Sequence, residues 1–211
     1  MAMGRAPNAV ANLDLGFDQI VPVERITSSD YIFIKSTGID EVEKVILVAD
    51  EDNTEIFLNG STIPSYTLNS GEYASILGLD FSANGNLYVT SSKKVFAYQS
   101  IGDDGAIDQR NQELFFVPPL SCQTPRVIDN IPFIDLIGTR QFTGRVTIVT
   151  TTGATLNFII DGTNYTLASL AGIGVNVVGP IAVIGNTNYE TYVLTGVTGN
   201  VSVYSTGELY L

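Results

Sequence analysis

Two acid-rich turns hold the residues of this chain whose types and spacing could do chemistry. The candidate sets are Asp50, Asp52 and Asn53 in the first turn and Asp103, Asp104 and Asp108 in the second. Carboxylate and amide oxygens are the ligands that Ca²⁺ prefers, although neither set has the twelve-residue spacing of an EF-hand. The sequence therefore leaves room for calcium as a cofactor. The alternative is an Asx-rich turn whose side chains satisfy their own backbone.

Other catalytic and metal chemistries have little support in the composition. The chain contains no histidine, which removes Ser-His-Asp and Cys-His nucleophile systems and histidine-based zinc sites. Its one cysteine, Cys122, allows no internal disulfide and is expected to be a small buried residue. The carboxylates that could pair in a glycosidase lie in turns, where water solvates them. We therefore expect a protein that is not an enzyme.

The charge balance limits the partners. With 22 acidic and 10 basic residues, the net charge is −12, and a phosphate backbone would be repelled. Nucleic acid is therefore excluded as a partner. No apolar run reaches the roughly 18 residues of a membrane helix, so membrane insertion is not expected. The first residues lack the apolar core of a signal peptide, and STGELYL ends in strand rhythm, so we expect a piece of a longer chain.

A repeated pattern indicates which elements must position these residues. Residues 45–61 and 146–162 both run from a β-branched strand through a polar turn to a second strand closed by Asn-Gly or Asp-Gly. Further segments follow in the same order, ending with VFAYQS at 95–100 and VSVYST at 201–206. Tyr98 and Tyr204 occupy equivalent positions, which indicates a shared role in the core. A chance match of five ordered segments is improbable, so the pattern predicts an internal repeat.

The repeat predicts an all-β fold of two similar β-sandwich-like modules packed into one rigid unit. Each module has about six or seven short strands at the spacing typical of a sandwich. The predicted organisation is an N-terminal extension with an edge strand (1–30), a first module (31–101), a packed connector (102–140) and a second module (141–211). The connector is too apolar to be a free linker, so we expect it to pack across both modules.

The two dipeptides Asn59-Gly60 and Asp161-Gly162 are predicted to form corresponding type I′ hairpin turns. Such a turn needs positive φ at both central residues, which Asn, Asp and Gly adopt at low steric cost. Because strand side chains alternate, Ile56 and Leu58 should face the core and Phe57 the other side. Phe158 and Ile160 should repeat that arrangement in the second module.

Several segments together resemble a known family. YIFIKSTG, VEKVILVADEDNTEIFLNG, YTLNSGEY, NLYVTSSKKVFAYQS and ELFFVPPLSC are similar to the bacterial version of the IgGFc-binding-protein N-terminal domain, over about residues 30–165. The resemblance implies a place in long, secreted, multidomain proteins of Bacteroidota, adhesin-like or gliding-associated and exported by the type IX system. These motifs are structural, so the resemblance transfers no catalytic residue to positions in this chain.

The resemblance implies a non-enzymatic adhesion or binding module at the bacterial cell surface. Its partner would be a surface protein or a glycan of unknown identity. This chain lacks the cysteine-rich neighbours of the animal protein after which the family is named, so immunoglobulin binding is not carried over. Two alternatives remain open, a carbohydrate-binding module of a polysaccharide-processing protein and a purely structural stalk.

Overall fold

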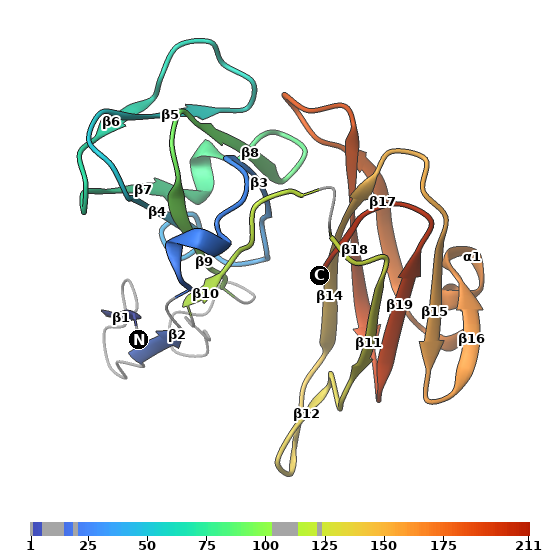
Figure 1. Ribbon diagram of the computed structural model, residues 1–211. Helices are drawn as coiled ribbons and strands as arrows, with labels where there is room; N and C mark the ends of the chain where they lie inside the picture. The colour runs from blue at the N-terminus through green and yellow to red at the C-terminus, as the bar shows by residue number, and fades with distance from the viewer. Residues whose placement is uncertain (1, 6–14, 19–20, 103–113, 122–123) are drawn as a thin grey trace. The chain divides into compact units, whose positions relative to one another are not determined.

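The computed structural model describes residues 2–5, 15–18, 21–102, 114–121 and 124–211 (Figure 1). In these residues the secondary structure is almost entirely antiparallel strand, with one short α-helix, α1 (Leu167–Leu170), and three 3₁₀ turns at Val23–Arg25, Gly78–Asp80 and Ala171–Ile173. The predicted all-β, sandwich-like fold class is confirmed. No helix in the described part of the chain has both the length and the apolar composition that a membrane span needs.

The chain divides into two compact units. The first unit comprises Met1–Ser121 with Ile184–Asn186, and the second comprises Cys122–Val183 with Thr187–Leu211. This division agrees with two β modules in one chain. Rigid packing of the modules against each other stays a prediction.

The first unit contains two four-stranded sheets and a separate hairpin. One sheet has the strand order β3-β8-β5-β6, the other has the order β10-β9-β4-β7, and β1 pairs with β2. The strands are β1 (Ala2–Arg5), β2 (Leu15–Asp18), β3 (Asp30–Ile34), β4 (Lys44–Ala49), β5 (Thr54–Leu58), β6 (Tyr66–Leu68), β7 (Tyr73–Leu77), β8 (Asn86–Ser91), β9 (Val95–Ser100) and β10 (Leu114–Phe116).

The second unit also contains two four-stranded sheets. Their strand orders are β11-β19-β15-β16 and β17-β18-β14-β20, and β12 and β13 form a hairpin of their own. The strands are β11 (Val127–Ile131), β12 (Leu136–Ile137), β13 (Arg140–Gln141), β14 (Gly144–Thr151), β15 (Leu156–Ile160), β16 (Thr163–Thr166), β17 (Asn176–Ala182), β18 (Tyr189–Val197), β19 (Val201–Ser205) and β20 (Leu209–Tyr210).

Each unit has its own hydrophobic core, built by alternation along the strands. In β4 every second residue is buried, because successive strand side chains point to opposite faces. Burying one such aliphatic side chain contributes about 1.5–3 kcal/mol relative to leaving it in water. The first core consists of Tyr31, Phe33, Val45, Leu47, Ala49, Ile56, Leu68, Ala74, Ile76, Phe81, Leu87, Val89, Val95 and Ala97. The second consists of Val146, Ile148, Leu156, Phe158, Ile160, Leu170, Val175, Tyr192, Leu194, Val197, Val201, Val203 and Leu209.

The two predicted turns have the expected backbone conformation. The φ angles are 52° at Asn59 and 77° at Gly60, and 46° at Asp161 and 80° at Gly162. Asp161-Gly162 is the whole loop of the β15–β16 hairpin, whereas five further residues separate Asn59-Gly60 from β6. Pro64 lies in that longer loop and has no N–H to donate to a ladder, which explains the delayed pairing.

The register predicted around these turns is also confirmed. Ile56 is fully buried and Leu58 packs against the first core, while Phe57 faces the other way, pairs with Thr90 and belongs to neither core. Phe158 and Ile160 are buried in the second core. Alternation and turn type together therefore set which residues of β5 and β15 face inward.

The repeat is not confirmed strand for strand. β5–β6 and β15–β16 are corresponding hairpins, but β9 pairs with β4 whereas β19, its expected counterpart, pairs with β15. Tyr98 and Tyr204 consequently have no shared core position. Tyr98 lies opposite Ile46 and Tyr204 opposite Asn157, and both residues are outside the two cores. Tyr98 is buried whereas Tyr204 is half-buried, so the two tyrosines do not share a core role.

The two flanking segments form strands, and the predicted bounds of the extension (1–30) and the connector (102–140) stay predictions. The ends of the expected connector supply one strand to each unit, since β10 pairs with β9 and β11 pairs with β19. In the N-terminal extension β2 forms as a strand but pairs with β1, within its own small hairpin. Cys122 lies outside the described residues.

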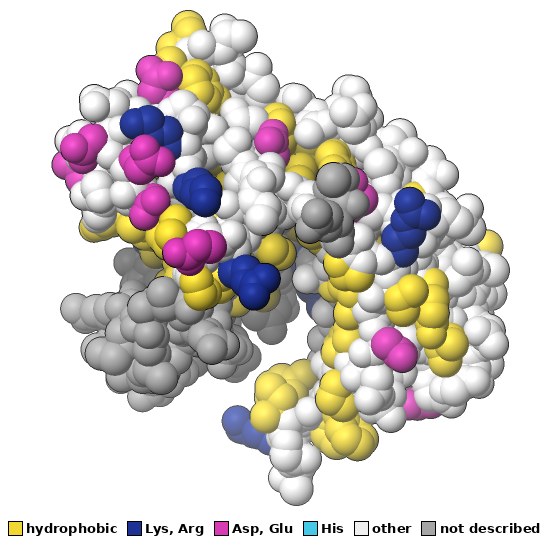
Figure 2. Space-filling model, in the orientation of Figure 1, with side chains coloured by type: hydrophobic (Ala, Val, Ile, Leu, Met, Phe, Trp, Pro, Cys, Tyr) yellow, Lys and Arg dark blue, Asp and Glu magenta, His cyan; other side chains and the backbone are white. Residues whose placement is uncertain are grey.

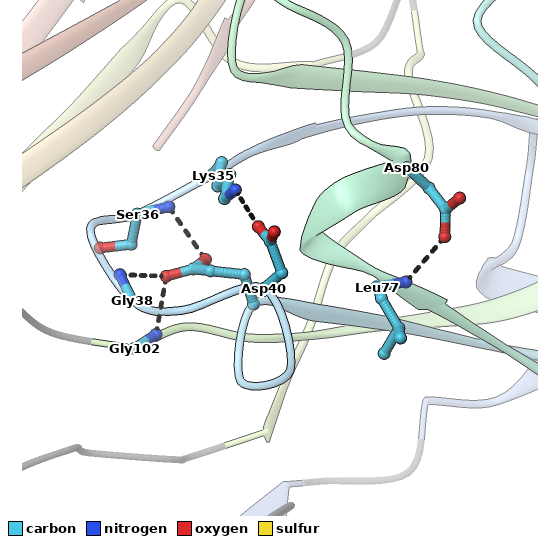
Figure 3. A network of polar contacts seen from close by, with 8 residues as sticks. Lys35, Ser36, Gly38, Asp40, Leu77, Asp80 and Gly102 are labelled. Atoms are coloured by element: carbon cyan, nitrogen blue, oxygen red, sulfur yellow. Dashed lines mark hydrogen bonds and ion pairs between the residues drawn. The ribbon is translucent and has the colours of Figure 1, made fainter. Parts of the chain in front are cut away.

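A buried carboxylate fixes the loop before β4. Glu43 is fully buried, and its oxygens accept the backbone N–H groups of Ser36 at 2.9 Å, Gly38 at 2.9 Å and Gly102 at 3.0 Å (Figure 3). A Cβ on Gly38 would lie 2.7 Å from Glu43 Oε1, so only glycine lets the chain approach this closely. The Lys35 ammonium forms an ion pair with the Asp40 carboxylate on the same loop.

We expect Glu43→Ala to destabilise the first unit strongly. The substitution leaves three N–H donors beside a cavity, and each unsatisfied buried donor costs about 1–3 kcal/mol. The free energy of unfolding, measured by urea denaturation, should fall by about 3 kcal/mol or more, and Glu43→Gln should lose less because its carbonyl still accepts. Glu41→Ala is the control, because Glu41 is exposed. A loss equal to that of the control would contradict the role assigned to Glu43.

We expect Gly162→Val to destabilise the second unit by about 1–2 kcal/mol, the penalty for a β-branched residue in the left-handed region. Gly162 has open space around it, so the strain comes from its φ of 80° alone. Gly172→Val is the matched control, because Gly172 has equal space and no positive φ. Differential scanning calorimetry of both variants measures the difference, and equal melting temperatures would refute the turn argument.

Candidate binding surface

The first calcium candidate set is part of a network of turns. The Ser70 N–H donates to Asp52 Oδ1 at 2.9 Å, and the Ser70 hydroxyl donates to the Asp50 carbonyl at 2.8 Å. Lys93 Nζ donates to the Asp52 carbonyl at 2.6 Å. Asn53 has a φ of 55°, a left-handed conformation that asparagine tolerates in turns. The Asp52 carboxylate therefore already accepts a backbone N–H. The neighbouring Lys93 ammonium would repel a bound cation.

The described residues add no other arrangement of calcium ligands. No group of three or more His, Cys, Asp or Glu side chains in this part of the chain is placed to hold a metal ion. Asp103, Asp104 and Asp108 lie outside the described residues, so that set is not placed. Calcium binding stays a prediction, and the turn at Asp50–Asn53 has a structural reason of its own.

Two of the tyrosines whose pKa is raised donate a hydrogen bond to a carboxylate. Burial, followed by hydrogen bonding to Glu190 at 2.8 Å, raises the pKa of Tyr192 to about 12. Burial also raises the pKa of Tyr88, whose hydroxyl donates to Asp30. Both phenols are therefore neutral hydrogen-bond donors at neutral pH. A general acid or base works best with a pKa near the operating pH, so these pairs are better explained as structure.

The hairpin formed by β12 and β13 exposes a group of large apolar side chains. Phe133 is 58% exposed, Ile137 70% and Phe142 49%, and Leu136 is exposed beside them. The hairpin extends from the body of the second unit (Figure 1), and Figure 2 shows its hydrophobic side chains next to a basic one. Clustered exposed apolar side chains mark interaction sites in soluble proteins. We call residues 133–142 the apolar hairpin.

A buried aspartate holds the apolar hairpin rigid. Asp135 is 8% exposed, and its Oδ1 accepts the Gly199 N–H at 2.8 Å, while its carbonyl accepts the Phe142 N–H at 2.7 Å. The Ile134 N–H donates to the Gly199 carbonyl, and the Phe133 N–H donates to Asn200 Oδ1 at 3.1 Å. These bonds join the hairpin to the β18–β19 turn. The exposed side chains are thus presented by an ordered backbone.

Backbone strain is present at the base of the apolar hairpin. Phe133 has a φ of 48°, a conformation that is rare for a bulky residue and costs about 1–2 kcal/mol. Such strain persists only where the surroundings determine it, and it occurs preferentially at functional sites. The strain at Phe133 is therefore a second feature, independent of side-chain exposure, that indicates a functional role for the apolar hairpin.

The charge of the apolar hairpin differs from that of the whole chain. Its two charged residues are Asp135, which is buried, and Arg140, which is exposed. The exposed surface therefore carries one positive charge in a chain of net charge −12. A rigid, convex, apolar and basic surface fits a concave apolar site with an acidic rim.

The sequence did not single out this surface. The run from Ile131 to Phe142 reads as buried because it is apolar, and it was expected to pack as a connector. A signal was present in Ile137-Gly138-Thr139-Arg140, a turn flanked by apolar residues, but composition alone does not separate a buried hairpin from an exposed one.

A family model described as IgGFc binding protein matches residues 2–211. No curated protein and no solved structure shows significant similarity to the chain.

We expect Phe133→Gly to leave stability unchanged or to raise it by up to about 1 kcal/mol, because glycine accepts positive φ without strain. Phe142→Gly is the matched control, since Phe142 has similar exposure and no positive φ. That substitution should destabilise by about 0.5–1 kcal/mol through backbone entropy. Urea denaturation of both variants measures the change in the free energy of unfolding for each. A clear loss of stability in Phe133→Gly would contradict the strain assigned to Phe133.

Proposed function

Since the chain belongs to the IgGFc binding protein family, we propose that it is a non-enzymatic binding module whose partner is a protein. We further propose that it acts outside the cell, as an adhesion module of a larger secreted bacterial protein. The family match extends over residues 2–211, and it is the reason for placing binding before catalysis. The composition agrees, because a chain without histidine lacks the commonest general base.

The observation that supports this proposal best is the apolar hairpin. Interface energy concentrates in a few apolar or aromatic side chains that fill pockets on the partner. Phe133, Ile137 and Phe142 are such side chains, and the bonds of Asp135 fix them in advance. Preorganisation lowers the entropy lost on binding, which favours a tight contact from a small surface.

A glycan partner has less support. A sugar-binding site needs aromatic faces together with convergent polar groups. Of the ten tyrosines, all of them in described parts of the chain, Tyr73 is the exposed one at 67%. One isolated tyrosine on β7 does not make a platform, and the exposed rings of Phe133 and Phe142 belong to the apolar hairpin, so the protein partner is preferred.

Two arrays test the proposal. The purified chain is applied to an array of purified extracellular proteins that includes IgG Fc, and to a glycan array with and without Ca²⁺. We expect saturable binding to a protein, and a loss of at least tenfold in affinity for Ile137→Ser with Phe142→Ser. Ile63→Ser is the matched control, because Ile63 is 74% exposed in the first unit, and it should bind normally.

Each other outcome has a defined meaning. Binding to glycans alone would replace the protein partner with a sugar. Binding to a protein that is unaffected by the hairpin substitutions would retain a binding module but remove the apolar hairpin as its site. No binding on either array would favour the structural stalk. Binding that strictly requires Ca²⁺ would support a calcium site in the acid-rich turns.

A further inference from the structure

The dipeptide Asn-Gly occurs twice in the chain, as Asn59-Gly60 and as Asn84-Gly85. Asparagine is a chemically labile residue, and it is most labile before glycine, which has no side chain to shield its backbone nitrogen. Both pairs lie in turns of the first unit, and both glycines have positive φ, 77° at Gly60 and 72° at Gly85. A difference in reactivity between the two pairs therefore reflects their surroundings in the fold.

The reaction open to such a pair is deamidation through a cyclic imide. At the second pair, the Gly85 nitrogen loses its proton to hydroxide and attacks Asn84 Cγ. The N–Cγ bond forms, the Cγ–Nδ2 bond breaks and ammonia leaves. Water then opens the imide at either carbonyl, giving aspartate or isoaspartate, in which the main chain runs through the side-chain carbonyl. Water is the co-reactant, and no atom is oxidised or reduced.

The first pair is protected from this reaction at both reacting groups. Asn59 Nδ2 donates to the Asp80 carbonyl at 3.3 Å, and Asn59 Oδ1 accepts the Tyr88 N–H at 3.2 Å. Gly185, which belongs to the same unit, packs on the peptide bond of the pair, because a Cβ on Gly185 would lie 2.4 Å from the Asn59 carbonyl carbon and 2.4 Å from the Gly60 nitrogen. The side chain is thus held by two bonds, and the attacking nitrogen is covered on one side.

The second pair lies in an open surface turn that leads into β8. Asn84 is exposed, and among the described residues, chain neighbours aside, no heavy atom lies within 4 Å of a Cβ built on Gly85. The Gly85 N–H donates to the Ser82 carbonyl at 2.9 Å, which closes the turn. Hydrogen bonds of exposed turns break in local fluctuations that leave the rest of a domain folded. The Gly85 nitrogen therefore becomes available for attack in the native protein.

We propose that Asn84 is a site of spontaneous deamidation in the folded protein, whereas Asn59 is preserved by the contacts around it. The modification adds a negative charge to the first unit and needs no enzyme. This inference does not depend on the identity of the partner of the apolar hairpin.

The turn at Asn84 is fixed at both ends, so isoaspartate distorts it. The Ser82 N–H donates to the Asn86 carbonyl at 2.8 Å, and the Gly85 carbonyl accepts the Lys35 N–H at 2.8 Å. Asn86 is fully buried at the first position of β8. Isoaspartate adds one methylene group to the main chain between these anchored residues. The longer chain strains or breaks one of the two bonds, which weakens the pairing of β3 with β8 at its end.

Peptide mapping by mass spectrometry of the full chain, incubated at mildly alkaline pH, tests the proposal. We expect Asn84 to deamidate at least about tenfold faster than Asn59, because two hydrogen bonds must break before Asn59 can react. The same chain unfolded in urea is the control, and there the two asparagines should react at similar rates. Asn84→Gln should remove the fast reaction, because the longer side chain forms its imide far more slowly.

Three outcomes would overturn the proposal. They are equal rates at the two asparagines in the folded chain, faster loss of Asn59, and survival of both residues in the folded chain while both react in urea.

The structural effect has its own measurement. The isoaspartate form, purified by anion exchange, should unfold at a lower temperature than the Asn84→Asp variant, which carries the same charge on a main chain of normal length. Differential scanning calorimetry of both forms measures the difference. Equal melting temperatures would refute the distortion assigned to the turn.

Discussion

A buried carboxylate that accepts backbone N–H groups is the interaction on which the loops of this protein depend. Glu43 joins residues 36–38 to Gly102, so it links the loop before β4 to the segment just after β9. The hydrogen bonds are charge-assisted and lie in a buried site, where such bonds are strong and where leaving one unmade is costly. With one cysteine in the chain, no internal disulfide can do this work. Asp135 has the corresponding role in the second unit, where it holds the apolar hairpin to the β18–β19 turn.

This use of carboxylates separates two populations within an acidic chain. Glu43 and Asp135 are buried and accept backbone N–H groups, and Asp52 accepts one at the surface. These carboxylates therefore fix the conformation of loops. Exposed acids such as Glu41, Glu51 and Glu55 instead contribute to the negative surface field, which disfavours polyanions as partners. Arg140 stands out against that field because it lies among apolar side chains in the second unit. Apolarity and a local positive charge thus coincide at the apolar hairpin.

Alternation and turn chemistry predicted the parts of the fold that are decided locally. Ile56 and Phe158 were placed in the cores, and Asn59-Gly60 and Asp161-Gly162 in turns of positive φ, because neighbouring residues alone determine these features. The same signals could not tell which sheet β9 or β19 would join. Both sheets of a sandwich offer an equivalent inner face, so the choice depends on contacts distant in sequence. Exposure of the apolar hairpin and the three bonds of Glu43 escaped prediction for the same reason.

The pairing of β11 with β19 has a consequence for the order of events during synthesis. Val127 leaves the ribosome about 77 residues before Tyr204, its partner in the ladder. At about 5–20 residues per second, β11 waits about 4–15 s for that partner. During this interval the first unit already has nearly all of its strands, whereas the second has an unpaired strand next to an apolar stretch. Unpaired strand edges and exposed apolar surface promote aggregation. The nascent second unit therefore exposes an unpaired strand for several seconds before its sheet can close.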